Sequence, residues 1–343
     1  MKLTEAISSA IKKADKPKRA FDLDIIKAPV NSELKEFTAY FKQSMRSNVR
    51  LVDTVARYIV KQKGKRIRPI LVFLCAETCG GISESTYRGA TLVEILHTAT
   101  LVHDDVVDDA DTRRGLASIN AVWKNKIAVL MGDYLLSTGL MLSLKNEDHY
   151  FLKTISDAVR RMSEGEILQI QKSRELDIDE QTYFKIISDK TASLISTCTE
   201  IGAASATTNV EQRTLMKDFG ENIGLAFQIR DDLLDYTSRK SIIGKPVGGD
   251  MKEKKITLPL IHALQKAPKK ESRRILKKIK NGARGNDVEE IVSFVQQYDG
   301  IAYAVKKAEQ FSAQARECLR PFSDSEAKKS LLMFVDYVME REK

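Results

Sequence analysis

Two short aspartate clusters with the same spacing, Asp-Asp-x-x-Asp, constrain this chain more than any other feature. They comprise Asp104, Asp105 and Asp108, and Asp231, Asp232 and Asp235. On a helix, the first and last aspartates of each cluster share one face, where like charges repel. Apolar residues at helical intervals precede both clusters, at 92–102 and at 223–229. A solvated acidic helix face is therefore the less favoured interpretation. We expect instead that each cluster ends an apolar helix and that its carboxylates point into a cavity.

Paired carboxylates on one helix face are useful where hard divalent cations bind. Mg²⁺ prefers octahedral oxygen ligands, and it commonly takes one or two carboxylates together with waters and substrate phosphates. Two such faces that look at each other would hold a cluster of Mg²⁺ ions around a diphosphate. The clusters therefore predict a metal-dependent site for a diphosphate substrate.

Helical periodicity dominates the rest of the chain, and convincing β-alternation is absent. The seven prolines and seventeen glycines mostly lie between helical stretches. The sequence therefore predicts an all-α fold, a single large helical bundle with a central cavity and about ten or more helices. In such bundles, inward-facing side chains on facing helices form the site. We expect one domain over residues 1–343, with 1–20 as a basic, loosely attached N-terminal segment.

Charge and composition narrow the choice of partners and compartment. The formal net charge is +9, and one basic run lies at 266–284. For that run a solvated helix face is favoured over a docking patch, and an anionic membrane surface is favoured over nucleic acid, whose motifs are missing. The four cysteines lack metal-site or disulfide spacing. The apolar segment 127–144 is interrupted by Asp133, which favours a buried helix over a membrane span, so we expect a cytoplasmic enzyme.

Further motifs surround the two clusters in a fixed order between Gly64 and Pro259. They are Gly64-Lys65-Arg66-Ile67-Arg68-Pro69, Leu96-His97, Asp111-Thr112-Arg113-Arg114-Gly115, Lys190-Thr191, Phe227-Gln228, Gly244-Lys245-Pro246 with Gly249-Asp250, and Lys255-Ile256-Thr257-Leu258-Pro259. In this order and spacing the chain closely resembles the all-trans polyprenyl diphosphate synthase family, most of all its long-chain bacterial members of the octaprenyl and solanesyl type. The resemblance implies the isoprenoid synthase fold, a homodimer, and head-to-tail condensation of isopentenyl diphosphate onto an allylic diphosphate.

The resemblance also implies roles for individual residues. The two aspartate clusters bind roughly three Mg²⁺ ions, and Asp235 is the aspartate that would reach a metal only through water. The residues on the allylic diphosphate are Arg113, Lys190, Thr191, Gln228, Lys245 and Lys255, with Lys254 as the alternative to the last. The residues on isopentenyl diphosphate, which binds without a metal, are Lys65, Arg68, His97 and Arg114. The residues expected to act in catalysis itself are Asp104, Asp105, Asp108, Asp231, Asp232 and Lys190. The resemblance further implies that the released diphosphate accepts the proton that is lost in the condensation.

Product length depends on the residues one and two helical turns before the first cluster, which form the floor of the tail cavity in this family. Short-chain synthases place an aromatic residue there or insert two residues into the cluster. Here the positions hold Thr100 and Ala99, with Leu96 about 5.4 Å deeper, and the cluster has no insertion. We therefore expect a deep cavity and a long polyprenyl tail of the quinone type. Candidate floor residues on a facing helix are Leu140, Met141 and Leu144. A geranylgeranyl or farnesyl product is the alternative.

Three other classes of protein share parts of this pattern. A terpene cyclase would normally replace the second cluster by a mixed Asn/Ser/Glu motif. A head-to-head squalene-type synthase would lack the basic motif that contains Lys65 and Arg68. A non-catalytic regulatory subunit of a heteromeric prenyl synthase would usually lose aspartates or arginines from the site, whereas this chain keeps them. The sequence therefore favours a catalytic synthase.

Overall fold

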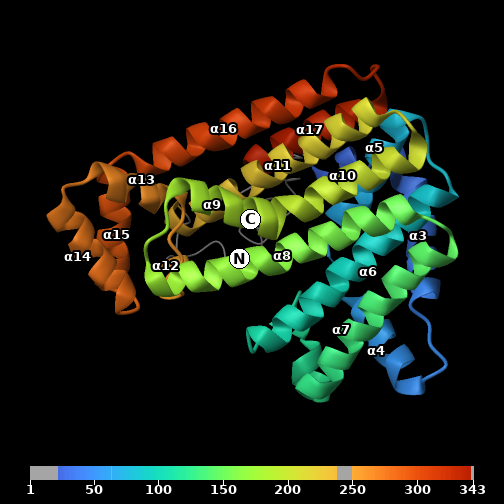
Figure 1. The fold of residues 1–343 in the computed structure, drawn as a ribbon, viewed down its shortest axis with the longest axis horizontal. Coiled ribbons are helices and arrows are strands. Elements are labelled where there is room, and N and C mark those ends of the chain that lie inside the picture. The colour runs from blue at the N-terminus through green and yellow to red at the C-terminus, as the bar shows by residue number, and fades with distance from the viewer. Residues whose placement is uncertain (1–21, 63, 238–248, 341–343) are drawn as a thin grey trace, which may run out of the picture.

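The computed structural model describes residues 22–62, 64–237 and 249–340, which form a helical protein with one short hairpin (Figure 1). The first half comprises α2 (Leu23–Ile26), η1 (Ala28–Val30), α3 (Asn31–Ser44), α4 (Arg50–Lys61), α5 (Ile67–Cys79), α6 (Glu84–Val107), β1 (Thr112–Arg113), β2 (Leu116–Ala117), α7 (Ile119–Lys145) and α8 (His149–Glu175). The second half comprises α9 (Glu180–Ile187), η2 (Ser188–Ala192), α10 (Ser193–Ala206), α11 (Val210–Thr237), α12 (Gly249–Lys252), α13 (Leu258–Lys266), α14 (Lys269–Lys280), α15 (Asn286–Gln297), α16 (Gly300–Leu319) and α17 (Glu326–Glu340). The predicted all-α fold is confirmed.

Two hydrophobic clusters form the core. The larger one contains most of α5, α6 and α10 together with parts of the N-terminal helices and α17. The smaller one gathers α13 to α16 around the C-terminal part of α11. Phe311 and Met339 pack against both clusters, and α11 contributes buried residues to each. That a single domain covers the whole chain stays a prediction, since residues 1–21 lie outside the described part.

Helix α7 is buried on one face only. In the described part it is the one helix whose length and composition would allow a membrane span, and 33% of its apolar window is buried. It packs closely on α6, because a Cβ added at Gly139 would lie 3.3 Å from Leu96 Cγ. Its other face exposes apolar side chains, namely Val122, Val129, Leu130, Met141 and Leu144. The prediction of a buried helix is therefore correct for one face of α7 and wrong for the other.

The side of α7 that meets α6 also corrects the proposed cavity floor. The buried residues of α7 include Ala128, Met131, Leu135 and Gly139, which recur at helical intervals on one face. Met141 and Leu144 are each 47% exposed, so they do not face α6. The prediction that these two residues form the floor is wrong for this chain taken alone, because the sequence did not reveal which face of the apolar helix packs inward.

Candidate active site

The first aspartate cluster lies where α6 ends. Asp104 and Asp105 belong to its last turn, and Asp108 is the residue that caps it. Asp105 is buried and accepts hydrogen bonds from the Arg113 guanidinium, at 2.8 Å from Nε. The pKa of Asp104 is raised by burial and then by the carboxylates of Glu166 and Asp108. Negative charge at a helix C-terminus also opposes the helix dipole, so this cluster is poised to attract cations.

The second cluster lies near the C-terminal end of α11. Asp232 is buried, and its carboxylate accepts hydrogen bonds from Tyr183 Oη at 2.7 Å and Gln228 Nε2 at 2.8 Å. Burial, followed by the charge of Asp250, raises the pKa of Asp232 to about 7. Asp231 is the exposed member of the cluster and lines a pocket with Asp232.

Asp235 and Asp250 are linked through the start of α12. The two carboxylate oxygens of Asp235 accept hydrogen bonds from the backbone N–H groups of Gly249 (3.0 Å) and Asp250 (3.2 Å). Burial, and then the charge of Asp235, raises the pKa of Asp250 to about 6. Asp250 lines the same pocket as Asp231 and Asp232. Sequence reasoning gave Asp250 no role, although it belongs to the Gly249-Asp250 motif that supported the resemblance.

That pocket has a volume of about 200 Å³ and brings together several residues predicted for the allylic diphosphate. Its polar lining includes Lys190, Thr191, Gln228, Asp231, Asp232, Asp250 and Lys255. Lys190 Nζ lies 2.5 Å from Glu166, and Lys255 Nζ lies 2.6 Å from Glu253. Thr191 donates a hydrogen bond to Gln228 at 2.8 Å, and Gln228 in turn donates one to Asp232 at 2.8 Å. Lys245 lies outside the described residues.

The predicted isopentenyl diphosphate residues gather at a separate place. His97 is 7% exposed, and burial together with the charges of Arg68, Arg114 and Arg113 lowers its pKa well below the usual range. Among the described residues, neither His97 Nδ1 nor Arg68 Nε has a hydrogen-bond partner, although both atoms are buried. Buried polar atoms normally have partners, so this positive cluster fits an anion. Lys65 is instead exposed, and its Nζ contacts Tyr337 Oη of α17 at 3.1 Å.

A β-hairpin that follows α6 carries Arg113 and Arg114. Arg113 of β1 pairs with Leu116 of β2, and the turn residues Arg114 and Gly115 have φ values of 52° and 78°. Two-residue hairpin turns of this kind require positive φ, which glycine adopts without strain. Arg114 also packs over Gly64, where an added Cβ would lie 2.6 Å from Arg114 Nη1. Gly64 thus allows the hairpin to approach the segment just before α5, the helix that carries Arg68 at its second residue.

The residues predicted to control product length lie on α6, before Asp104, and they are wholly or partly buried. Ala99 and Leu96 are buried, whereas Thr100 is half-buried and donates a hydrogen bond to His97 O at 2.8 Å. None of these three residues lines the 200 Å³ pocket. Their place one to two turns before Asp104 is as predicted, and the depth of the cavity stays a prediction.

The carboxylates fit Mg²⁺ in their chemistry, because Mg²⁺ prefers oxygen ligands. Among the described residues, no three acidic, histidine or cysteine side chains are grouped so as to hold one ion by themselves. Mg²⁺ does not need such a cage, because substrate phosphates and waters complete its shell. Burial, followed by neighbouring carboxylates, raises the pKa of Asp104, Asp232 and Asp250, so added positive charge would stabilise their ionised forms. Bound Mg²⁺ would supply that charge.

Comparison with known proteins identifies the family. The family model described as "Polyprenyl synthetase" matches residues 49–297. The all-trans-nonaprenyl-diphosphate synthase (geranyl-diphosphate specific) of Rhodobacter capsulatus is 36% identical, over 94% of this chain and 98% of that protein. The structure resembles a decaprenyl diphosphate synthase from Rhodobacter capsulatus, with a TM-score of 0.87, 31% identity, and coverage of 94% of this chain and 100% of that one.

A second solved structure has a shorter product in its name. It is a geranylgeranyl pyrophosphate synthase from Bacteroides thetaiotaomicron, with a TM-score of 0.78, 35% identity, and coverage of 93% of this chain and 99% of that one. Fold and motif order are thus common to relatives that are named for different product lengths. The chain belongs to the polyprenyl synthetase family of all-trans prenyltransferases.

Proposed function

We propose that this enzyme condenses isopentenyl diphosphate head-to-tail onto an allylic diphosphate in a Mg²⁺-dependent reaction, and that it makes a long-chain all-trans polyprenyl diphosphate for quinone side chains. The observation that carries the proposal is the pairing of two sites. One is an acidic pocket lined by residues of α8, η2 and α11 together with Asp250, and Asp104 of α6 lies near Glu166 of α8. The other is the positive cluster of buried His97 with Arg68 and Arg114. An allylic diphosphate with metals needs the first site, and a metal-free diphosphate acceptor needs the second.

In the proposed mechanism, side chains of this protein bind the allylic substrate and stabilise its diphosphate as the leaving group. When bound, Mg²⁺ supplies Lewis-acid stabilisation of negative charge on the departing diphosphate. The carboxylates that would hold the ions are Asp104, Asp105 and Asp108 at the end of α6, and Asp231, Asp232 and Asp250 on the other side. Asp235 supports this second group by fixing the backbone of Asp250. Lys190, Lys255 and Arg113 add fixed positive charge where the leaving group forms.

Isopentenyl diphosphate would bind beside α6, at the cluster of His97, Arg68 and Arg114. Guanidinium groups present planar pairs of N–H donors to phosphate oxygens. The lowered pKa keeps His97 neutral near pH 7, so it donates one hydrogen bond without adding charge. The double bond of the acceptor then attacks the allylic carbon, and the released diphosphate accepts the proton lost in the step.

Substitutions should separate the two diphosphate sites. His97→Ala or Arg68→Ala should raise the KM for isopentenyl diphosphate at least about tenfold, because each removes a hydrogen-bonding partner worth about 1.5–3 kcal/mol to a charged group. Lys190→Ala should instead raise the KM for the allylic diphosphate. Steady-state kinetics with each substrate varied in turn measures both effects. Exchanged preferences between the two groups of variants would refute this assignment.

A long product is supported by small or non-aromatic side chains at Ala99, Thr100 and Leu96, and by the relatives named as nonaprenyl and decaprenyl synthases. A geranylgeranyl product is the second candidate, favoured by the close structural likeness to the Bacteroides thetaiotaomicron protein. A non-catalytic role as a regulatory subunit is disfavoured, since both aspartate clusters and both arginines of the hairpin are present.

A homodimer is proposed through the exposed apolar face of α7. Contiguous apolar surface on a soluble protein commonly marks an interface, and most homo-oligomers are symmetric dimers. This face includes Leu130 at 55% exposure and Met141 at 47%. A second copy that covers it would also explain why so apolar a helix does not need a membrane.

Leu130→Glu should therefore convert the dimer into a monomer, because it places a charge in the centre of the apolar interface. Analytical ultracentrifugation measures the mass. The control is Val210→Glu, which adds the same charge at an exposed valine (72%) at the start of α11. An unchanged mass for Leu130→Glu would place the interface elsewhere.

We also place the enzyme in the cytoplasm with a peripheral membrane contact through α14, which lies at one end of the molecule (Figure 1). Five exposed basic residues of α14 form no ion pair among the described residues: Lys269, Lys270, Arg273, Lys277 and Lys280. Each basic residue near an anionic bilayer contributes about 1 kcal/mol. Co-sedimentation with anionic vesicles, but not with neutral ones, is the expected result, and equal binding to both would contradict it.

A further inference from the structure

Lys190 and Thr191 lie on an unusual piece of backbone. The chain passes from α9 to α10 through the π-helical turn η2, in which Ser193 N–H donates to Ser188 O. The Ser193 hydroxyl also donates to Asp189 O at 2.6 Å. Single π-turns inside helices are rare and frequently occur at functional sites. Contacts with neighbouring residues must therefore stabilise this π-helical conformation over the regular α-helical one.

Two neighbouring helices enclose the turn at glycines. A Cβ added at Gly165 of α8 would lie 3.0 Å from both Asp189 Cβ and Lys190 N. A Cβ added at Gly224 of α11 would lie 2.5 Å from Ala192 Cα. Both helices therefore contact the backbone of η2 directly, so a rotation of the turn would force α8 and α11 to move.

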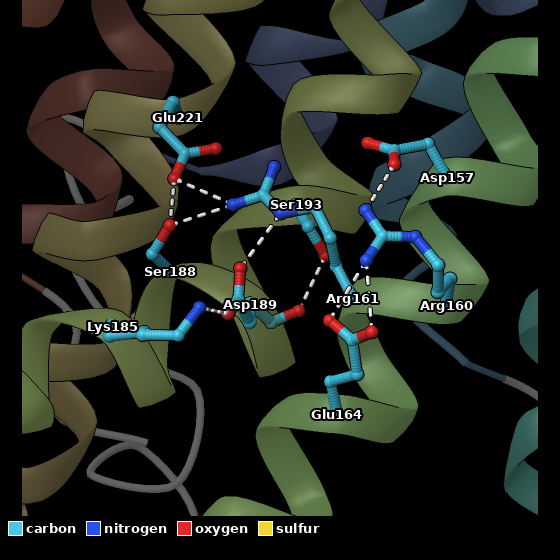
Figure 2. A network of polar contacts seen from close by, with 9 residues as sticks. All are labelled: Asp157, Arg160, Arg161, Glu164, Lys185, Ser188, Asp189, Ser193 and Glu221. Atoms are coloured by element: carbon cyan, nitrogen blue, oxygen red, sulfur yellow. Dashed lines mark hydrogen bonds and ion pairs between the residues drawn. The ribbon is translucent and has the colours of Figure 1, made fainter.

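A polar network outside the pocket ties the turn to these same helices (Figure 2). Arg161 of α8 donates from Nε to Asp189 Oδ1 at 2.8 Å and from Nη2 to Ser188 Oγ at 2.8 Å. Ser188 in turn donates its hydroxyl to Glu221 of α11. Lys185 binds the second carboxylate oxygen of Asp189 at 2.8 Å. One guanidinium thus joins α8, η2 and α11.

The charges in this network depend on one another. Asp189 is 5% exposed, and although burial alone would raise its pKa, hydrogen bonds from Lys185 and Arg161 hold the pKa below its usual value. Removing one partner of such a buried pair leaves the other charge poorly compensated. The arrangement is therefore sensitive to the loss of Arg161.

The same helix α8 also contacts the pocket side of the turn. Glu166 and Gln169 of α8 bind Lys190 Nζ at 2.5 and 3.4 Å, whereas Arg161 binds the adjacent residue, Asp189. We propose that Arg161, through Asp189 and through Ser188 with Glu221, is a positioning residue that fixes η2 so that Lys190 and Thr191 present their side chains to the allylic diphosphate. This inference rests on the proposed function, which places the allylic diphosphate in that pocket.

Arg161→Gln should raise the KM for the allylic diphosphate at least about tenfold, because small misplacements of binding groups are costly. The KM for isopentenyl diphosphate should change less than about twofold. Arg161→Lys keeps the charge but loses the planar fork, so its allylic KM should lie between wild type and Arg161→Gln. The matched control is Arg160→Gln. Among the residues that the structure describes, Arg160 pairs only within α8, with Asp157 at 2.7 Å and Glu164 at 2.9 Å (Figure 2), and its loss should leave all constants unchanged.

A double-mutant cycle with Lys190→Ala tests whether Arg161 acts through the turn. If it does, Arg161→Gln should add little to the allylic KM of Lys190→Ala, whereas a general loss of stability would give additive effects. Additivity, or a normal allylic KM in folded Arg161→Gln beside a raised one in Lys190→Ala, overturns the inference alone. A normal allylic KM in Lys190→Ala overturns the proposed function at this site and the inference with it. If Arg161→Gln does not fold, Ser188→Ala carries the same cycle, since it breaks two links of the network without leaving a charge unpaired.

Discussion

Asp231→Ala should lower the turnover number at least about a thousandfold, equivalent to about 4 kcal/mol of transition-state stabilisation. Asp231 is the exposed aspartate of α11 that lines the pocket with Lys190 and Lys255. Its carboxylate would hold a cation that acts most strongly when the diphosphate departs, and groups of that kind affect turnover more than ground-state binding. Asp104→Ala, on the opposite side, should have an effect of similar size. Steady-state turnover at saturating Mg²⁺ measures both.

The control for these variants is Asp109→Asn. Asp109 follows the first cluster directly, is exposed, and has a positive φ of 48°, which asparagine tolerates. It should turn over at the wild-type rate. Circular dichroism should show unchanged helix content in all three variants, because neither Asp104 nor Asp231 is part of the hydrophobic core. Turnover near wild type for either alanine variant would mean that the clusters are not the catalytic centre.

Thr100→Phe should shorten the product from a long polyprenyl chain to farnesyl or geranylgeranyl diphosphate while condensation continues. Thr100 lies one helical turn before Asp104 on the same face of α6, so a ring there would block a tail that runs down this helix. Its side chain is half-buried, whereas Ala99 is only 2% exposed. Ala99→Tyr should have the same effect with a greater risk of overpacking, which typically costs about 1–3 kcal/mol. Chromatography of dephosphorylated products measures the length.

Thr98→Phe is the matched control on the same helix. Thr98 is also half-buried, but it lines a small pocket with Arg113 and Arg114 rather than the proposed path of the tail. It should leave the product length unchanged, whatever it does to isopentenyl diphosphate binding. Melting curves should be compared first. A folded, active Thr100→Phe enzyme that still makes the wild-type length would mean that the tail takes another path.

Sequence reasoning succeeded where a local pattern sets the structure. The apolar stripe before Asp104 does form α6, the one before Asp231 forms part of α11, and both lead to the acidic ends that the spacing predicts. His97 lies near Arg68 and Arg114, with which the resemblance grouped it, but also near Arg113, which the resemblance placed on the allylic side. For the residues on α6 and α11, helical periodicity places the side chains, so the pattern was sufficient.

It failed where tertiary contacts decide. The hairpin at Arg113 has strands of only two residues, too short for any alternation to show. The π-turn at Lys190 depends on Gly165, Gly224 and Arg161, which are distant in sequence from the residue they position. The inward face of α7 was hidden because both of its faces are apolar, and only packing on Leu96 distinguishes them. Asp250 gained importance from its neighbours rather than from its own motif.

The most direct test of the central proposal is the product of the unmodified enzyme. The protein is incubated with farnesyl and isopentenyl diphosphates, with Mg²⁺ or with a chelator, and the dephosphorylated products are separated by chain length. The account predicts an all-trans product of the octaprenyl or solanesyl type with Mg²⁺ and none with the chelator. A product that stops at geranylgeranyl diphosphate would contradict the deep cavity, and the absence of any condensation with Mg²⁺ would contradict the proposed reaction itself.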